Sequence, residues 1–201
     1  MKEFFYQNLE AIPIDLCKEL IEIFNSPDFE WKHALLNNQV YNERRNCFIN
    51  DIILREEDTK YPAINQLKVI MNTYLKTVNK SIFKGIDTPD YFADVQAIRY
   101  DPAMAPDGTL PHFDWHTDDV WTQPTLNLIR KLTQICVISD GETEFEGGKC
   151  EFDPLHGTLD YDGRKQGSLV MFPSFLKHRV LPITSGVRYV VNGWSYGPSW
   201  R

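Results

Sequence analysis

The segment 111–119, with the sequence PHFDWHTDD, contains two histidines and three aspartates. Side chains at positions i and i+2 of a β-strand point to the same face of a sheet. His116 and Asp118 would therefore present an imidazole and a carboxylate on one side. A second histidine from a distant strand would complete a set of two histidines and one carboxylate, which suits iron(II) and leaves coordination positions open. Taken alone the triplet is a weak signal, because histidine and aspartate also meet in surface turns.

His178 is the candidate for that second histidine. It lies in the segment 167–194, where one predicted strand ends near Pro173, the chain turns and a new strand begins. Arg188 follows in the next predicted strand, and a planar guanidinium can hold a carboxylate through two parallel hydrogen bonds. These residues together predict an iron site held by His116, Asp118 and His178, with Arg188 anchoring the far carboxylate of 2-oxoglutarate as a co-substrate.

A second triplet of the same kind, His112 with Asp114, competes for the role of the first two ligands. Both triplets have the same parity along the strand, so the alternation of side chains does not separate them. We prefer His116 and Asp118, because His112 directly follows Pro111 at the edge of the predicted strand. His112 and Asp114 stay open as the alternative pair.

The elements that must position these residues are two helices followed by many short strands. Leu16, Leu20 and Phe24 recur at helical spacing, and a second helical pattern follows Pro62. From about residue 91 onward, short runs of β-branched and aromatic residues are bounded by Gly, Pro and Asp, which is typical of a β-sandwich or barrel. We expect one domain over 1–201, in which 1–90 is mostly helical support and 91–201 is the β core. The expected strands are 95–100, 113–118, 132–138, 149–152, 168–172, 178–182 and 187–194.

Four blocks of sequence carry a family resemblance. They are Arg99-Tyr100, FDWHTDD at 113–119, RKLTQICVISD at 130–140 with FEGGKCEF at 145–152, and GSLVMFPSFLKHRVLPITSGVRYVVNGW at 167–194. The last block is the most specific of the four. With these blocks the chain from about 95 to 198 resembles the prolyl 4-hydroxylase-like branch of the 2-oxoglutarate/iron(II) dioxygenase superfamily. The resemblance implies an α+β fold that is mainly β, a double-stranded β-helix (jelly roll) with supporting N-terminal helices.

The resemblance also implies an activity and roles for five residues. His116, Asp118 and His178 would bind iron(II) and form the catalytic centre, while Arg188 and Tyr100 would bind 2-oxoglutarate. Dioxygen would be the other co-substrate, with ascorbate as a supporting reductant. The enzyme would be an oxidoreductase that couples decarboxylation of 2-oxoglutarate to hydroxylation of a substrate C–H bond. The presence of Asp118 favours hydroxylation, because halogenating relatives lack this carboxylate.

The substrate is not fixed by these motifs. A prolyl residue in a peptide or protein is the leading expectation, and a free amino acid or other small molecule is the alternative. The competing class is a non-catalytic metal-binding jelly-roll module. Arg188 argues against this class, because such a module has no use for a co-substrate anchor.

Composition and charge bear on the binding partners and the cellular location of the protein. The chain is 42% hydrophobic and 24% charged, as globular proteins are, and its net charge of −7 argues against a nucleic-acid partner. Its four scattered cysteines form no CxxC pair and predict reduced structural thiols. The sequence has no signal-peptide pattern and no run of the roughly 20 apolar residues that a membrane span needs. We therefore expect a soluble, cytoplasmic enzyme with no membrane partner; the oligomeric state is left open.

Overall fold

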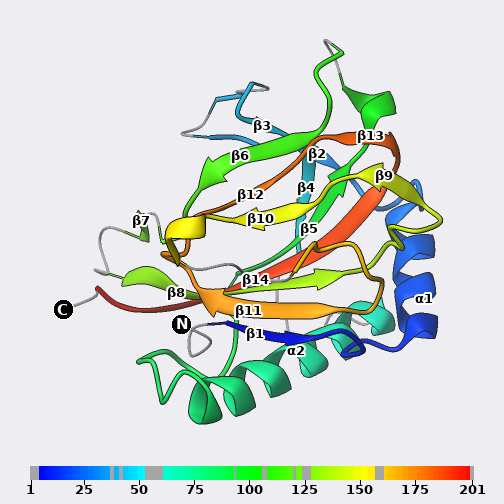
Figure 1. The fold of residues 1–201 in the computed structure, drawn as a ribbon. Coiled ribbons are helices and arrows are strands. Elements are labelled where there is room, and N and C mark those ends of the chain that lie inside the picture. The colour runs from blue at the N-terminus through cyan, green and yellow to red at the C-terminus, as the bar shows by residue number, and fades with distance from the viewer. Residues whose placement is uncertain are drawn as a thin grey trace.

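Two antiparallel β-sheets form two layers, and both helices lie against the outer side of the larger sheet (Figure 1). The computed structural model describes residues 5–36, 39–40, 43–52, 61–92, 94–105, 108–119, 121–123, 128–156 and 161–199. Within this part of the chain, neither helix is long and apolar enough to cross a membrane. The jelly-roll fold with supporting helices, expected from the sequence, is confirmed.

The helices begin where the sequence pattern indicates. α1 spans Ile14–Phe24 and α2 spans Pro62–Ser81, with the proline in the first turn, where its missing N–H costs no hydrogen bond. The larger sheet has the order β1-β11-β8-β14-β5-β4-β2, with β7 pairing β8 at one end. Its strands are β1 (Tyr6–Asn8), β2 (Lys32–His33), β4 (Phe48–Asp51), β5 (Asp94–Tyr100), β7 (Trp121–Gln123), β8 (Leu128–Val137), β11 (Leu169–Pro173) and β14 (Arg188–Pro198).

The smaller sheet has the order β10-β12-β6-β3, and a separate pair joins β13 to β9. The first ninety residues thus contribute strands to both sheets in addition to the two helices. The strands of the smaller sheet are β3 (Arg45–Asn46), β6 (His112–His116), β10 (Cys150–Phe152) and β12 (His178–Val180), and the pair consists of β9 (Phe145–Gly147) and β13 (Ile183–Gly186). Two short 3₁₀ turns, η2 (Pro102–Met104) and η4 (Pro154–His156), complete the elements.

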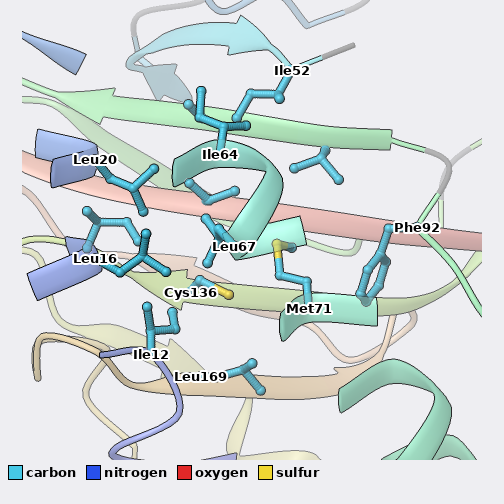
Figure 2. Close-up of a cluster of buried hydrophobic side chains, with 14 of the residues drawn as sticks. Ile12, Leu16, Leu20, Ile52, Ile64, Leu67, Met71, Phe92, Cys136 and Leu169 are labelled. Atoms are coloured by element: carbon cyan, nitrogen blue, oxygen red, sulfur yellow. The ribbon is translucent and has the colours of Figure 1, made fainter. Parts of the chain in front are cut away.

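One hydrophobic core lies between the helices and the larger sheet (Figure 2). Leu16 and Leu20 of α1 and Leu67 and Met71 of α2 are buried in it, because a spacing of four residues places each pair on one face of its helix. α2 packs so closely against β14 that a Cβ atom added to Gly193 would lie 2.7 Å from the Met71 Cε atom. This packing holds the central strand of the sheet firmly in place.

A second core lies between the two sheets. The side chains of β5 alternate, so that Val95 and Ala97 face the helices while Ile98 and Tyr100 face the smaller sheet. Tyr100, Ile98 and their neighbours on β14 and β8 therefore line the space between the layers. Part of this space is filled by apolar side chains, and part is a cavity.

Candidate metal and co-substrate site

His116, Asp118 and His178 come together between the sheets. β6 and β12 are neighbours, and His116 lies directly opposite His178 across them. The Asp118 carboxylate lies 3.6 Å from His116 Nε2 and 3.7 Å from His178 Nε2. One ligand atom from each residue lies within 4.8 Å of the others, and no other group of three His, Cys, Asp or Glu side chains in the described ranges does so.

Both imidazoles are held in the form that a metal needs. His116 Nδ1 lies 2.8 Å from the Asp114 carbonyl oxygen, and His178 Nδ1 lies 2.9 Å from that of Leu176. A carbonyl oxygen only accepts, so each Nδ1 carries a proton, and in the neutral form of each ring Nε2 then has the lone pair that a metal needs. Burial lowers the pKa of His116 to about 3, which keeps this ring neutral at physiological pH.

Asp118 reaches the site from outside the strand in which it was expected. β6 ends at His116, and Asp118 lies in the bend that follows, where its backbone N–H donates to the Ser174 carbonyl at 2.8 Å. Thr133 Oγ1 donates to the carboxylate at 2.9 Å and lies 3.0 Å from Ser174 Oγ. Burial alone would raise the pKa of Asp118, but the neighbouring His178 and His116 lower it to about 2, so the carboxylate is ionised.

The alternative triplet lies elsewhere. The two ring nitrogens of His112 lie 2.8 Å from the Leu110 carbonyl oxygen and 3.0 Å from that of Glu43, and Asp114 is exposed. The structure therefore brings His116 and Asp118, and not His112 and Asp114, to His178.

Arg188 is buried in the same cavity without an acidic partner. Only 1% of the residue is exposed, its Nη2 donates to the Gly163 carbonyl at 3.2 Å, and its Nε is buried without a hydrogen bond. No carboxylate in the described ranges forms an ion pair with it. Tyr100 is its register partner on β5, with the ring centre 5.3 Å from the guanidinium carbon. A buried, uncompensated guanidinium is costly, so this arrangement fits an anionic ligand.

The triad, Arg188 and Tyr100 line one cavity of about 680 Å³. This volume lies within the range of small-molecule sites, and it leaves room for more than a five-carbon acid. The alternation of β5 and β14 adds further wall residues that the motifs did not single out. Gln96 has the same parity as Tyr100, and Asn192 and Trp194 have that of Arg188, so strand parity could have found them. Arg45 of β3 also lines the cavity.

A partly buried histidine, a buried histidine and a buried carboxylate around a cavity between the sheets of a jelly roll define the non-haem iron oxygenase class of site. Residues 95–196 match the family model of the 2OG-Fe(II) oxygenase superfamily, and the chain belongs to this family. The cofactors of the superfamily are iron(II), 2-oxoglutarate and dioxygen. The donor set fits iron(II), and the unpaired Arg188 fits a dicarboxylate.

Curated relatives and solved structures resemble this chain. A PKHD-type hydroxylase of Crocosphaera subtropica is 26% identical over 137 residues, which cover 68% of this chain and 57% of the relative. A PKHD-type hydroxylase of a Synechococcus species (strain CC9902) is 33% identical over 82 residues, covering 41% and 35%. The chain thus spans little more than half the length of the first of these relatives and about a third of the second.

The similarity to solved structures extends over almost the whole chain. A Pseudomonas putida prolyl-4-hydroxylase has a TM-score of 0.73 and 21% identity, covering 95% of this chain and 91% of that one. A Trichoplax adhaerens prolyl hydroxylase, solved with a hypoxia inducible factor peptide fragment, has a TM-score of 0.73 and 16% identity, covering 97% and 84%. At these identities the likeness shows the fold.

Proposed function

We propose that the chain is a hydroxylase that couples decarboxylation of 2-oxoglutarate to insertion of an oxygen atom into a substrate C–H bond. The observation that carries this proposal is a single cavity with two complementary features. It holds two histidines and an ionised carboxylate on one side, and a buried arginine without an acidic partner on the other. A module that only binds metal would have no reason to bury that arginine.

In this proposal His116, Asp118 and His178 hold iron(II), and Arg188 with Tyr100 binds the far carboxylate of 2-oxoglutarate. The bound iron supplies the oxidising chemistry, in which 2-oxoglutarate and dioxygen yield succinate, carbon dioxide and a hydroxylated substrate. The chain holds the ligands rigid and keeps water away. The His116 ring stacks on the Phe113 ring, with 3.4 Å between the ring centroids. The His178 ring packs edge-on against the Phe172 ring, with 5.0 Å between the centroids.

The leading substrate that we propose is a prolyl residue in a peptide or protein. Its support is the prolyl hydroxylase names of the structures with this fold, together with the hydroxylase names of the curated relatives. A free amino acid or other small molecule is the alternative. We also propose that the chain is one domain and acts in the cytoplasm, in line with four cysteines that are all buried and unpaired.

The test is an anaerobic titration of the protein with iron(II) and 2-oxoglutarate, followed by visible absorption. We expect a weak charge-transfer band that requires both additions and disappears in His178→Ala. His33→Ala, which changes a histidine of β2 outside the cluster, should keep the band. Metal binding without any 2-oxoglutarate binding would contradict the enzymatic proposal and favour a binding module. Succinate release in air, with peptide and metabolite mixtures, then identifies the substrate.

A further inference from the structure

A second arginine in the cavity wall also lacks an acidic partner. Arg45 lies on β3, at the edge of the smaller sheet, with its guanidinium carbon 4.7 Å from the centre of the Phe113 ring. Its Nη2 donates to Gln96 Oε1 at 3.3 Å, and its Nε is buried without a hydrogen bond. No carboxylate in the described part of the chain forms an ion pair with it. The neighbouring Cys47 offers no charge, because burial raises the pKa of its thiol.

Arg45 serves a different end of the cavity from Arg188. Across β14 and β5, Arg188 lies opposite Tyr100, whereas Asn192 lies opposite Gln96, the residue that holds Arg45. Tyr100 and Gln96 are four residues apart on β5, which corresponds to about 13 Å along a strand. Arg188 and Arg45 therefore meet β5 at different positions, Arg188 beside Tyr100 and Arg45 at Gln96.

With iron(II) and 2-oxoglutarate bound, the positive charge of Arg45 would have no compensating negative charge in the site. Iron(II) with the Asp118 carboxylate carries one net positive charge, Arg188 adds another, and the 2-oxoglutarate dianion cancels both. Of the other arginines that line the cavity, Arg130 pairs with Asp94 at 3.5 Å, and Arg44 is exposed to solvent. Arg45 therefore keeps one positive charge in the wall, and a partly buried charge favours an anionic partner.

We propose that the substrate carries a carboxylate close to the carbon that is hydroxylated, and that Arg45, oriented by Gln96, binds this carboxylate. The inference rests on the proposed function and narrows its substrate class. The geometry favours this role, because the Phe113 ring contacts both the Arg45 guanidinium and the His116 ring. A carboxylate on Arg45 would thus lie about one aromatic ring away from the metal. It could be the α-carboxylate of an amino acid or the side chain of an acidic residue in a peptide.

Two matched pairs of probes separate these sources. L-proline and L-prolinamide differ in the α-carboxylate, and acetyl-Glu-Pro-amide and acetyl-Gln-Pro-amide differ in the side-chain carboxylate. Binding is measured by calorimetry without dioxygen, on the full chain loaded with iron(II) and 2-oxoglutarate. We expect the carboxylate member of one pair to bind roughly ten- to a hundredfold tighter than its amide. The pair that shows the preference identifies the source.

Arg45→Gln should abolish that preference, while Arg44→Gln, at the exposed neighbouring arginine, should keep it. Both variants should retain the 2-oxoglutarate absorption band, which shows that the site is folded. Equal binding or no binding of both members in both pairs overturns the inference, and so does a preference that survives in Arg45→Gln. Loss of 2-oxoglutarate binding in the unmodified protein is a different result, because it would overturn the proposed function instead.

Discussion

The hydroxyl group of Thr133 should tune the affinity of the site for its metal. It is fully buried and donates to the Asp118 carboxylate at 2.9 Å, while Ser174 Oγ lies 3.0 Å away on its other side. An ionised carboxylate can only accept, so the Thr133 proton points to Asp118 and the Ser174 proton points to Thr133. Thr133→Val keeps the shape of the side chain and removes this donor.

The size of the effect follows from the kind of bond that is lost. A hydrogen bond to a charged group contributes about 1.5–3 kcal/mol, so the free energy of unfolding of the metal-free protein should fall by about that amount. Groups that orient metal ligands typically contribute about 10- to 100-fold to metal affinity, so the dissociation constant for the metal should rise by roughly that factor. Urea unfolding in the presence of a chelator measures the first quantity, and anaerobic calorimetric titration with iron(II) measures the second.

Two controls make the result interpretable. Thr133→Ser keeps the hydroxyl and should recover most of the metal affinity. Thr73→Val removes a hydroxyl that donates at 2.8 Å to the Val69 carbonyl on the exposed side of α2, and it should leave metal binding unchanged. If Thr133→Val bound iron(II) as tightly as the unmodified protein, the role assigned to this hydroxyl would be wrong.

Three further predictions concern the site and the core. Arg188→Met should weaken 2-oxoglutarate binding by at least roughly thirtyfold. The Tm of the metal-free protein should stay unchanged or rise, because the substitution removes a buried charge that has no acidic partner. A large drop in Tm would contradict the view that Arg188 is uncompensated. His116→Ala should lose iron(II) binding in the same titration, whereas His112→Ala should keep it; the reverse pattern would favour the other triplet. Gly193→Ala should reduce the free energy of unfolding by about 1–3 kcal/mol in urea, since the new methyl group would lie 2.9 Å from Phe92 Cγ as well as 2.7 Å from Met71 Cε. Unchanged stability would show that these two side chains move aside.

Local patterns were enough to predict the helices and about half of the strands in the described residues. α1 contains Leu16, Leu20 and Phe24, which predicted it, and α2 begins at Pro62. A row of apolar side chains at helical spacing is a property of a short segment, so the sequence alone shows it. Strands β1, β2, β3, β7, β9 and β13 were not among the expected strands, and the pair β9 and β13 shows one reason. They are short and contain Gly147 and Gly186, whose φ angles of 78° and 72° make tight turns rather than a regular alternation.

The site was predictable only where a motif spans it. The spacing of residues 116 and 118 suggested a shared strand face, but the strand ends at His116, and a hydrogen bond to Ser174 directs Asp118 instead. Thr133, Ser174 and Arg45 reach the site from three distant segments, and no motif assigned any of them a role there. Such contacts depend on which strands become neighbours, and that is decided by the packing of the whole domain.

The position of β14 has a consequence for the order in which the chain can fold. β14 is the last strand of the described residues in sequence, yet it lies between β8 and β5 in the middle of the larger sheet. Until β14 has been synthesised, the backbone groups along one edge of β8 and one edge of β5 have no hydrogen-bond partner. Such exposed edges can pair with strands of other chains and cause aggregation. A chain truncated before Arg188 would therefore expose both edges, aggregate readily and also lack its proposed co-substrate anchor. The insertion of β14 between β8 and β5 therefore completes the larger sheet and the cavity wall in the same late step of folding.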